Sequence, residues 1–124
     1  MKSGKKRTIH KMDILVIKEY FGNLILTGNK TWEIRNTNTK KRGTISIAYS
    51  GTNKRFGTVE LVDSFPLTKE LFDENFFKHH NECTWDELLE SYNHPYAWVM
   101  ENPKLYSKPI PYEHPHGAVV WVKG

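Results

Sequence analysis

Residues 24–35 read LILTGNKTWEIR, and this stretch predicts a helix end followed at once by a strand. Leu24 and Ile25 continue an apolar spacing that is typical of a helix. Gly28 then supplies a residue that readily adopts the left-handed conformation found where helices stop. The sequence therefore indicates a helix over residues 19–28.

A strand is predicted directly afterwards, because β-favouring side chains alternate with polar ones over residues 31–35. Trp32 and Ile34 share one face of this strand. The other face carries three polar side chains: Thr31, Glu33 and Arg35. One face is thus suited to a core, and the other to solvent or a ligand.

Short, two-faced segments predominate in the rest of the chain. Further strands are predicted at residues 14–17, 44–50, 57–62, 96–100 and 118–122, and further helices start at Thr68 and Thr84. Residues 103–115 contain prolines that a central strand does not tolerate, which indicates an edge strand or a long loop. Such short strands need closure to bury their apolar faces, so we expect an α+β fold built on a small mixed β-barrel.

The chain of 124 residues fits one domain, and its net charge of +4 comes from one end. Residues 1–11 hold five basic and no acidic side chains, so 13 basic residues face 14 acidic ones in the remainder. We expect a basic, disordered tail at 1–11 and a folded domain at 12–124, with Met12 as an alternative start. The lone Cys83 excludes an internal disulfide and agrees with a reducing cytoplasm, and no apolar run suggests a membrane span.

Charge is unevenly distributed within the folded part. Residues 30–55 have seven basic side chains against Glu33 alone, whereas residues 60–90 have nine acidic side chains against two lysines. Opposed charged ends can orient a polyanion. The alternative is that both are ordinary solvated faces.

Residues 24–35, together with RGTISIAYS at 42–50, resemble the signature of the ASCH domain, a branch of the PUA-like superfamily. The segment YAWVMENPKLYSKPIPYEHPHGAVVWVK at 96–123 is similar to the closing strands of that family. The resemblance covers about residues 13–123. It implies a PUA-like barrel of five to six strands with two to three covering helices. It also implies recognition of RNA or a nucleotide in a cleft lined by the motif Gly-x-Lys-x-x-Glu-x-Arg.

Lys30, Glu33 and Arg35 are the motif residues in this chain. Lysine and arginine suit phosphate oxygens, and the Glu33 carboxylate could read a base edge or accept a proton. Lys30 and Glu33 are therefore the candidate catalytic residues. The alternative is a partly exposed salt bridge with no function.

Other candidates surround this motif. Lys18 ends the first predicted strand, as a lysine does in many similar sequences, and Ser50 ends the strand at 44–50; both suit contacts with phosphate or base, as does Thr31. Four aromatic residues are candidates for base stacking: Tyr49, Trp98, Tyr106 and Tyr112. Each has a plain alternative, as a strand end, a turn or part of the barrel core.

The sequence thus favours a cytoplasmic domain that binds single-stranded RNA, a nucleotide or a modified nucleoside. A hydrolase using the same cleft is the alternative: a single-strand ribonuclease or, less well matched, an N4-acetylcytidine amidohydrolase. That branch carries threonine where this chain has Glu33. An interaction module without a ligand is a third reading. We expect no cofactor, no metal and no membrane association, and the sequence indicates no particular protein partner.

Overall fold

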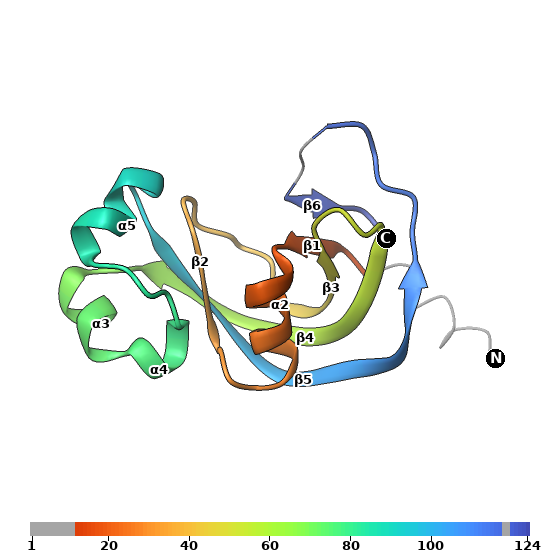
Figure 1. The fold of residues 1–124 in the computed structure, drawn as a ribbon, viewed down its shortest axis with the longest axis horizontal. Helices are drawn as coiled ribbons and strands as arrows, with labels where there is room; N and C mark the ends of the chain where they lie inside the picture. The colour runs from red at the N-terminus through yellow and green to blue at the C-terminus, as the bar shows by residue number, and fades with distance from the viewer. Residues whose placement is uncertain (1–11, 118–119) are drawn as a thin grey trace.

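The fold is built on one curled sheet of six strands, in a computed structural model that describes residues 12–117 and 120–124. The strands are β1 (Ile14–Ile17), β2 (Trp32–Arg35), β3 (Gly43–Tyr49), β4 (Lys54–Pro66), β5 (Tyr96–Pro111) and β6 (Trp121–Val122). Their order across the sheet is β2-β5-β4-β3-β1-β6. Figure 1 shows β4 and β5 bending around the other strands, which gives the sheet the form of a half-barrel.

The predicted α+β class and the small mixed barrel of five to six strands are confirmed. The sheet is mixed because β1 pairs with β3 in parallel, whereas the β3–β4 and β4–β5 pairs are antiparallel. The register between β4 and β5 shifts at three places. Such irregularities increase the local twist, and they account for the strong curl of these two long strands. The predicted tail at 1–11 and part of the predicted final strand lie outside the described residues.

The proline-rich segment is largely a strand, and the edge alternative is the correct one. β2 pairs with β5 only as far as Val99. Beyond this point β5 continues to Pro111 against β4, with Leu105 opposite Gly57 and Pro111 opposite Lys54. Proline is tolerated there because a strand with one partner needs its N–H groups on one side only.

Four helices accompany the described part of the sheet: α2 (Glu19–Leu26), α3 (Lys69–Glu74), α4 (Phe76–His79) and α5 (Trp85–Ser91). The number exceeds the predicted two to three because Asn75, with φ −129° and ψ 40°, interrupts the helix that begins after Thr68. The Asn75 side chain bonds the Leu71 carbonyl and closes α3. Thr68 and Thr84 are N-caps as predicted, and Thr84 forms a capping box with Glu87.

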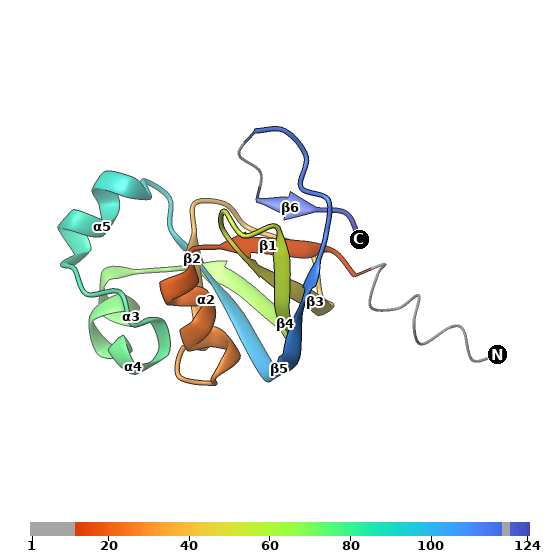
Figure 2. The same ribbon diagram turned by 45° about the vertical axis from the view of Figure 1, so that its right-hand side comes forward.

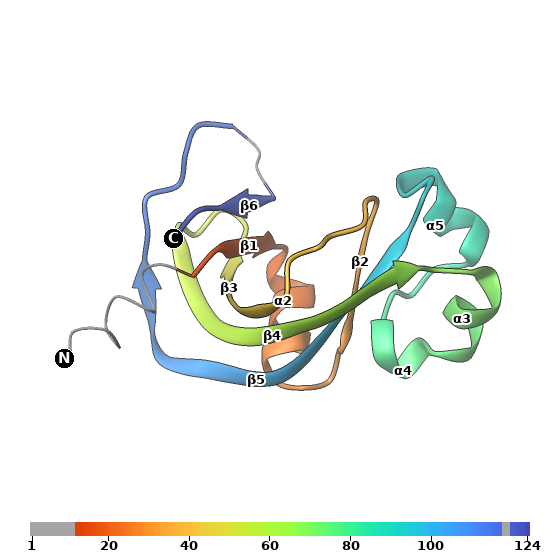
Figure 3. The same ribbon diagram turned by 180° about the vertical axis from the view of Figure 1, so that it is seen from behind.

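The helices divide between two places and cover two cores. Figure 2 shows α2 inside the curl of the sheet, while α3, α4 and α5 gather at one end of the molecule. Figure 3 shows the same group of helices from behind, next to the end of β4. The core with α2 includes Ile25, Ile47 and Leu61. The core with α3 and α5 includes Trp32, Ile34, Phe72 and Leu88.

Close packing fixes the position of α2. Gly22 faces the ring of Tyr49 on β3, and a Cβ at Gly22 would lie 2.6 Å from a ring carbon. No side chain fits at this distance, so glycine allows the helix to rest directly on the strand. The neighbouring Phe21 is thereby held at a defined place beside β1 and β2.

Candidate functional site

The strand β2 separates a buried apolar face from a polar one. Trp32 and Ile34 enter the core under the helices α3 and α5. Glu33 and Arg35 lie on the opposite face, as the alternation in the sequence predicts. Both side chains reach a cleft where the ends of β1 and β2 meet the start of α2.

Glu33 is a buried carboxylate held between two cations. Its Oε2 accepts a hydrogen bond of 2.9 Å from Nε of Arg35, and its Oε1 lies 3.8 Å from Nζ of Lys30. The residue is 6% exposed. A buried charge needs such partners because the interior solvates it poorly. Each carboxylate oxygen has two lone pairs, so Glu33 keeps acceptor capacity beyond these contacts.

Arg35 connects the carboxylate to the neighbouring strand. Its Nη2 donates to the carbonyl of Val16 at 3.0 Å, while Nε is occupied by Glu33. The guanidinium lies over the ring of Trp98, 5.8 Å from its centroid. These two hydrogen bonds use two of the five N–H donors of the guanidinium. These two bonds do not use the other three N–H donors, and the Arg35 side chain is 17% exposed.

Lys30 lies behind the wall of the cleft and is 1% exposed. Its ammonium donates to the carbonyl of His79 and, at 3.2 Å, to Oδ1 of Asn81. It also lies over the ring of Phe21, 4.7 Å from the centroid. An ammonium has three donors, of which two are used by the oxygens of His79 and Asn81, and Oε1 of Glu33 lies 3.8 Å from Nζ. The cation is thus enclosed by protein groups.

Burial lowers the pKa of Lys30 from 10.5 to about 8, because the interior disfavours the charged form. The carboxylate of Glu33 opposes this shift, and the guanidinium of Arg35 adds to it. A lysine whose pKa lies near neutrality is uncommon on a protein surface and frequent at functional sites.

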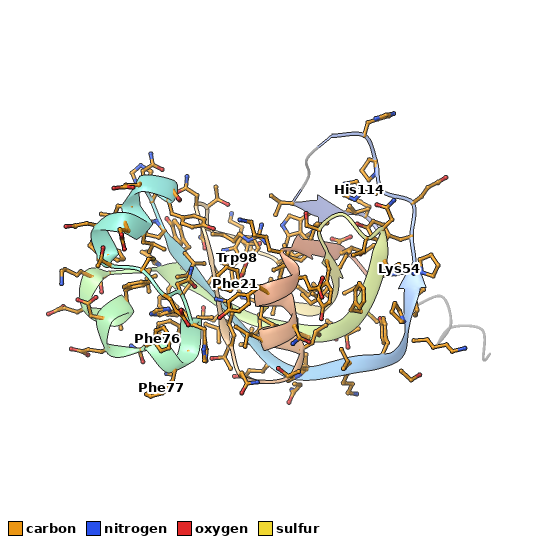
Figure 4. The ribbon with its side chains drawn as sticks, viewed as in Figure 1. Phe21, Lys54, Phe76, Phe77, Trp98 and His114 are labelled. Carbon is orange, nitrogen blue, oxygen red and sulfur yellow. The ribbon has the colours of Figure 1, made fainter. Side chains whose placement is uncertain are left out.

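The cleft has a volume of about 240 Å³ and combines charged, polar and aromatic walls. It is lined by Val16, Ile17, Lys18, Phe21, Glu33, Arg35, Ser50 and Tyr92. Figure 4 shows the Phe21 side chain projecting from α2 toward the side of the molecule that carries α4. Burial raises the pKa of the Tyr92 hydroxyl, and the charge of Glu33 raises it further.

Four of the predicted site residues therefore come together in one cleft: Lys18, Glu33, Arg35 and Ser50. They belong to three strand ends that are distant in sequence. Lys30 is not among the residues that line this cleft, because its ammonium is buried behind Glu33; the residue lines a second cavity instead. Lys30 neighbours the cleft through its ion pair with Glu33.

Three other predicted residues do not line this cleft. Thr31 precedes β2 and lines a second cavity of about 310 Å³ together with Met100 and Pro103. Trp98 is 1% exposed and stacks on Trp121, so it belongs to the core rather than to a stacking surface. Tyr112 bonds His114 at 2.8 Å, beside the small core around β6.

The remaining aromatic candidates have no place in the cleft either. Tyr49 is buried and stacks on Phe56 at 3.9 Å between ring centroids. Tyr106 lies in the part of β5 that pairs with β4, and it is not part of the cleft lining.

Sequence reasoning missed four residues around the site. Phe21 and Tyr92 line the cleft, and His79 and Asn81 hold Lys30. Phe21 follows Lys18 by three positions at the start of a predicted helix, and this spacing could have placed it beside Lys18. For the others no local signal exists, because their approach depends on how α4 and α5 pack against β2.

The family model of the ASCH domain matches residues 15–111. The chain belongs to the ASCH domain family. It is similar to the crystal structure of ASCH from Zymomonas mobilis, with a TM-score of 0.64 and 14% identity over 82% of this chain and 73% of that one. A mutant of the Zymomonas mobilis protein superposes with a TM-score of 0.68 at 14% identity, over 93% of this chain and 89% of that one.

At this identity the likeness to the Zymomonas mobilis ASCH structures concerns the fold. No curated protein matches the sequence. Within residues 12–117 and 120–124 of this ASCH domain, no helix is long and apolar enough to cross a membrane. Over the same residues, His, Cys, Asp and Glu side chains form no group of three that could hold a metal ion.

Proposed function

We propose that this ASCH domain binds a single base of RNA, or a modified nucleoside, in the cleft at Glu33. The observation that carries the proposal is a buried carboxylate, 6% exposed, that faces a cleft and retains acceptor capacity. Keeping such a charge in the interior is costly unless it is paired, and here two cations accompany it. A structural salt bridge does not need a cleft in front of it.

The size of the cleft limits its ligand. Pockets for drug-sized ligands have volumes of roughly 300–1,000 Å³. The cleft of about 240 Å³ lies just below this range, which suits one base with its sugar rather than a longer segment. A base inside a duplex cannot enter, so the ligand is a single strand or a free nucleoside.

The chemistry of the walls suits a base. A carboxylate accepts hydrogen bonds from amino and imino groups of bases, and the donors left on Arg35 match their carbonyl oxygens. Phe21 and Tyr92 supply aromatic rings, and stacking of a base on such rings contributes ~1–3 kcal/mol.

The rim of the cleft suits a phosphate. Lys18 is exposed at the junction of β1 and α2, and Ser50 is exposed at the end of β3. A lysine acts on phosphate as a point charge, and a serine hydroxyl can donate to its oxygens. We assign this binding to the cytoplasm, with which the lone Cys83 agrees.

The test is binding of short labelled single-stranded RNAs and of nucleosides, including N4-acetylcytidine, to the full chain. We expect single strands to bind and Glu33→Gln to weaken binding by about tenfold, because an amide loses one acceptor position and the charge. Glu90→Gln is the matched control, since Glu90 is exposed on α5. Equal binding by both variants, or no binding by the parent, would rule out the proposal.

A hydrolase in the same cleft is the second candidate, favoured by a lysine of pKa about 8 that pairs with a carboxylate. In hydrolysis of an acylated base, Glu33 would take a proton from a water molecule while the oxygen of that water bonds to the acyl carbon. The C–N bond then breaks, and the proton passes to the leaving amine. The same incubations, read by mass spectrometry for products, test it. If the substrates are unchanged after prolonged incubation with protein that binds them, the cleft binds its ligand without hydrolysing it.

A further inference from the structure

A cage of two residues from the end of α4 encloses the ammonium of Lys30. The carbonyl of His79 and Oδ1 of Asn81 both accept hydrogen bonds from Nζ. Neither residue lines the cleft at Glu33. Both are about 50 positions away from Lys30 in sequence, with separations of 49 and 51 residues.

The side chain of His79 makes this cage rigid. Its Nδ1 accepts the backbone N–H of Asn81 at 2.9 Å, so the proton of the ring must be on Nε2, which lies 2.8 Å from the carbonyl of Phe72. The ring also stacks on Phe72 with an interplanar angle of 6° and is 1% exposed. Burial lowers the pKa of His79, which favours the neutral ring that these bonds require.

The ammonium of Lys30 lies closer to the cage than to Glu33. Nζ lies 3.2 Å from Oδ1 of Asn81 but 3.8 Å from Oε1 of Glu33. A flexible lysine next to a carboxylate normally approaches to about 2.7–2.9 Å. The ammonium is thus held back from the carboxylate, and Oε1 remains without a short hydrogen bond from Lys30.

We propose that His79 and Asn81 are positioning residues that restrain Lys30 and so leave Oε1 of Glu33 available to a ligand. The proposal rests on the proposed function of the cleft. Lys30 then supplies a compensating charge without occupying the acceptor. If the cage opens, Nζ moves to Oε1 and competes with the N–H group of a base.

The restraint itself can be tested without any ligand. In a crystal structure of Asn81→Leu, we expect Nζ of Lys30 to form a direct hydrogen bond of about 2.8 Å with Oε1 of Glu33. In Asn81→Asp the acceptor is kept, and Nζ should stay at the cage. A distance that remains at 3.8 Å in Asn81→Leu would overturn the proposal, whether or not the parent binds RNA.

The effect on binding is tested by a double-mutant cycle. We expect Asn81→Leu to weaken binding of a single-stranded RNA by roughly five- to tenfold, the value of one hydrogen bond. In a Lys30→Met background the same change should have no further effect, because no ammonium remains to be restrained. An equal loss in both backgrounds would show a general structural effect and contradict the proposal.

Controls separate the cage from the fold. Asn23→Leu places the same substitution at an exposed position of α2, and we expect parental binding. Asn81→Asp should rescue binding relative to Asn81→Leu. If the parent binds no RNA or nucleoside, the proposed function fails, while the position of Nζ still decides the role of the cage.

Discussion

The wall and the rim of the cleft differ in how far their charged and polar residues are buried. Glu33 in the wall and Lys30 directly behind it are almost fully buried and bonded to other protein groups. At the rim, Lys18 and Ser50 are exposed, and Lys18 makes no side-chain bond to the helix that it caps. The two lysines therefore have different surroundings, although the sequence predicts both beside an anionic ligand.

This contrast separates stability from binding. A buried charge network is fixed before the ligand arrives, and changes to it are expected to alter the folding free energy. An exposed cation contributes mainly through long-range attraction, which salt screens. The following predictions test this division, in order of decreasing effect.

Alkaline pH should have the largest effect, and it should act through the buried Lys30. Because the pKa of Lys30 is lowered from 10.5 to about 8, the unfolded chain binds one more proton than the folded one between these values. This group therefore destabilises the fold at pH below 8, and the penalty of about 3 kcal/mol is relieved as pH rises toward 10.5. Urea unfolding of the parent and of Lys30→Met across this window measures it. A constant difference between them would contradict the prediction.

At pH 7, Lys30→Met should lower the free energy of unfolding by about 1–3 kcal/mol. The change leaves the carbonyl of His79 and Oδ1 of Asn81 without their buried donor. Relief of the buried charge offsets part of this cost. Lys18→Met is the control, with a change within ~0.5 kcal/mol because the side chain is exposed. Similar unfolding midpoints for the two variants would remove the distinction between wall and rim.

For RNA binding, Lys18→Ala should cost about five- to tenfold in affinity at low salt. It should also reduce the slope of log affinity against log salt by about 0.7, the value for one phosphate contact on a single strand. Lys108→Ala, an exposed lysine on β5, serves as the control. Titrations at several salt concentrations measure both. If Lys18→Ala leaves the slope of log affinity against log salt unchanged, Lys18 does not contact a phosphate.

The smallest effect is expected for Ser50→Ala, with a loss of binding free energy of about 0.5 kcal/mol. When the ligand leaves, an exposed hydroxyl replaces its hydrogen bond to the ligand with one to water, so its net contribution to the binding free energy is small. Fluorescence titration with the same RNA is precise enough to detect it when Thr44→Ala, also exposed and on β3, is run in parallel. A loss of affinity as large as that of Lys18→Ala would contradict the prediction that the exposed Ser50 contributes little to binding.

Local patterns predicted the parts of the site that depend on one strand. The alternation over residues 31–35 placed Glu33 and Arg35 on one face, and their 2.9 Å hydrogen bond follows from it. The capping box of Thr84 was also readable, because its partners are three residues apart. Such features need no knowledge of the rest of the fold.

Features that depend on distant contacts were not readable. Lys30 has the same local surroundings whether it is exposed or buried, and only the approach of α4 encloses it. The nitrogen of Trp98 would suit a surface, yet the ring is buried and this nitrogen donates to the carbonyl of Thr37 at 2.9 Å. The break at Asn75 likewise depends on a side-chain bond that competes with the helix.

The two faces of β2 restrict how the chain can vary in length. Removal of one residue between Leu26 and Trp32 would turn Trp32 and Ile34 into the cleft and move Glu33 under the helices. Between β2 and β3, by contrast, residues 36–42 form an irregular connection that can lengthen without reversing a face. We therefore expect insertions and deletions in related domains to concentrate after Arg35 and to be absent before Trp32.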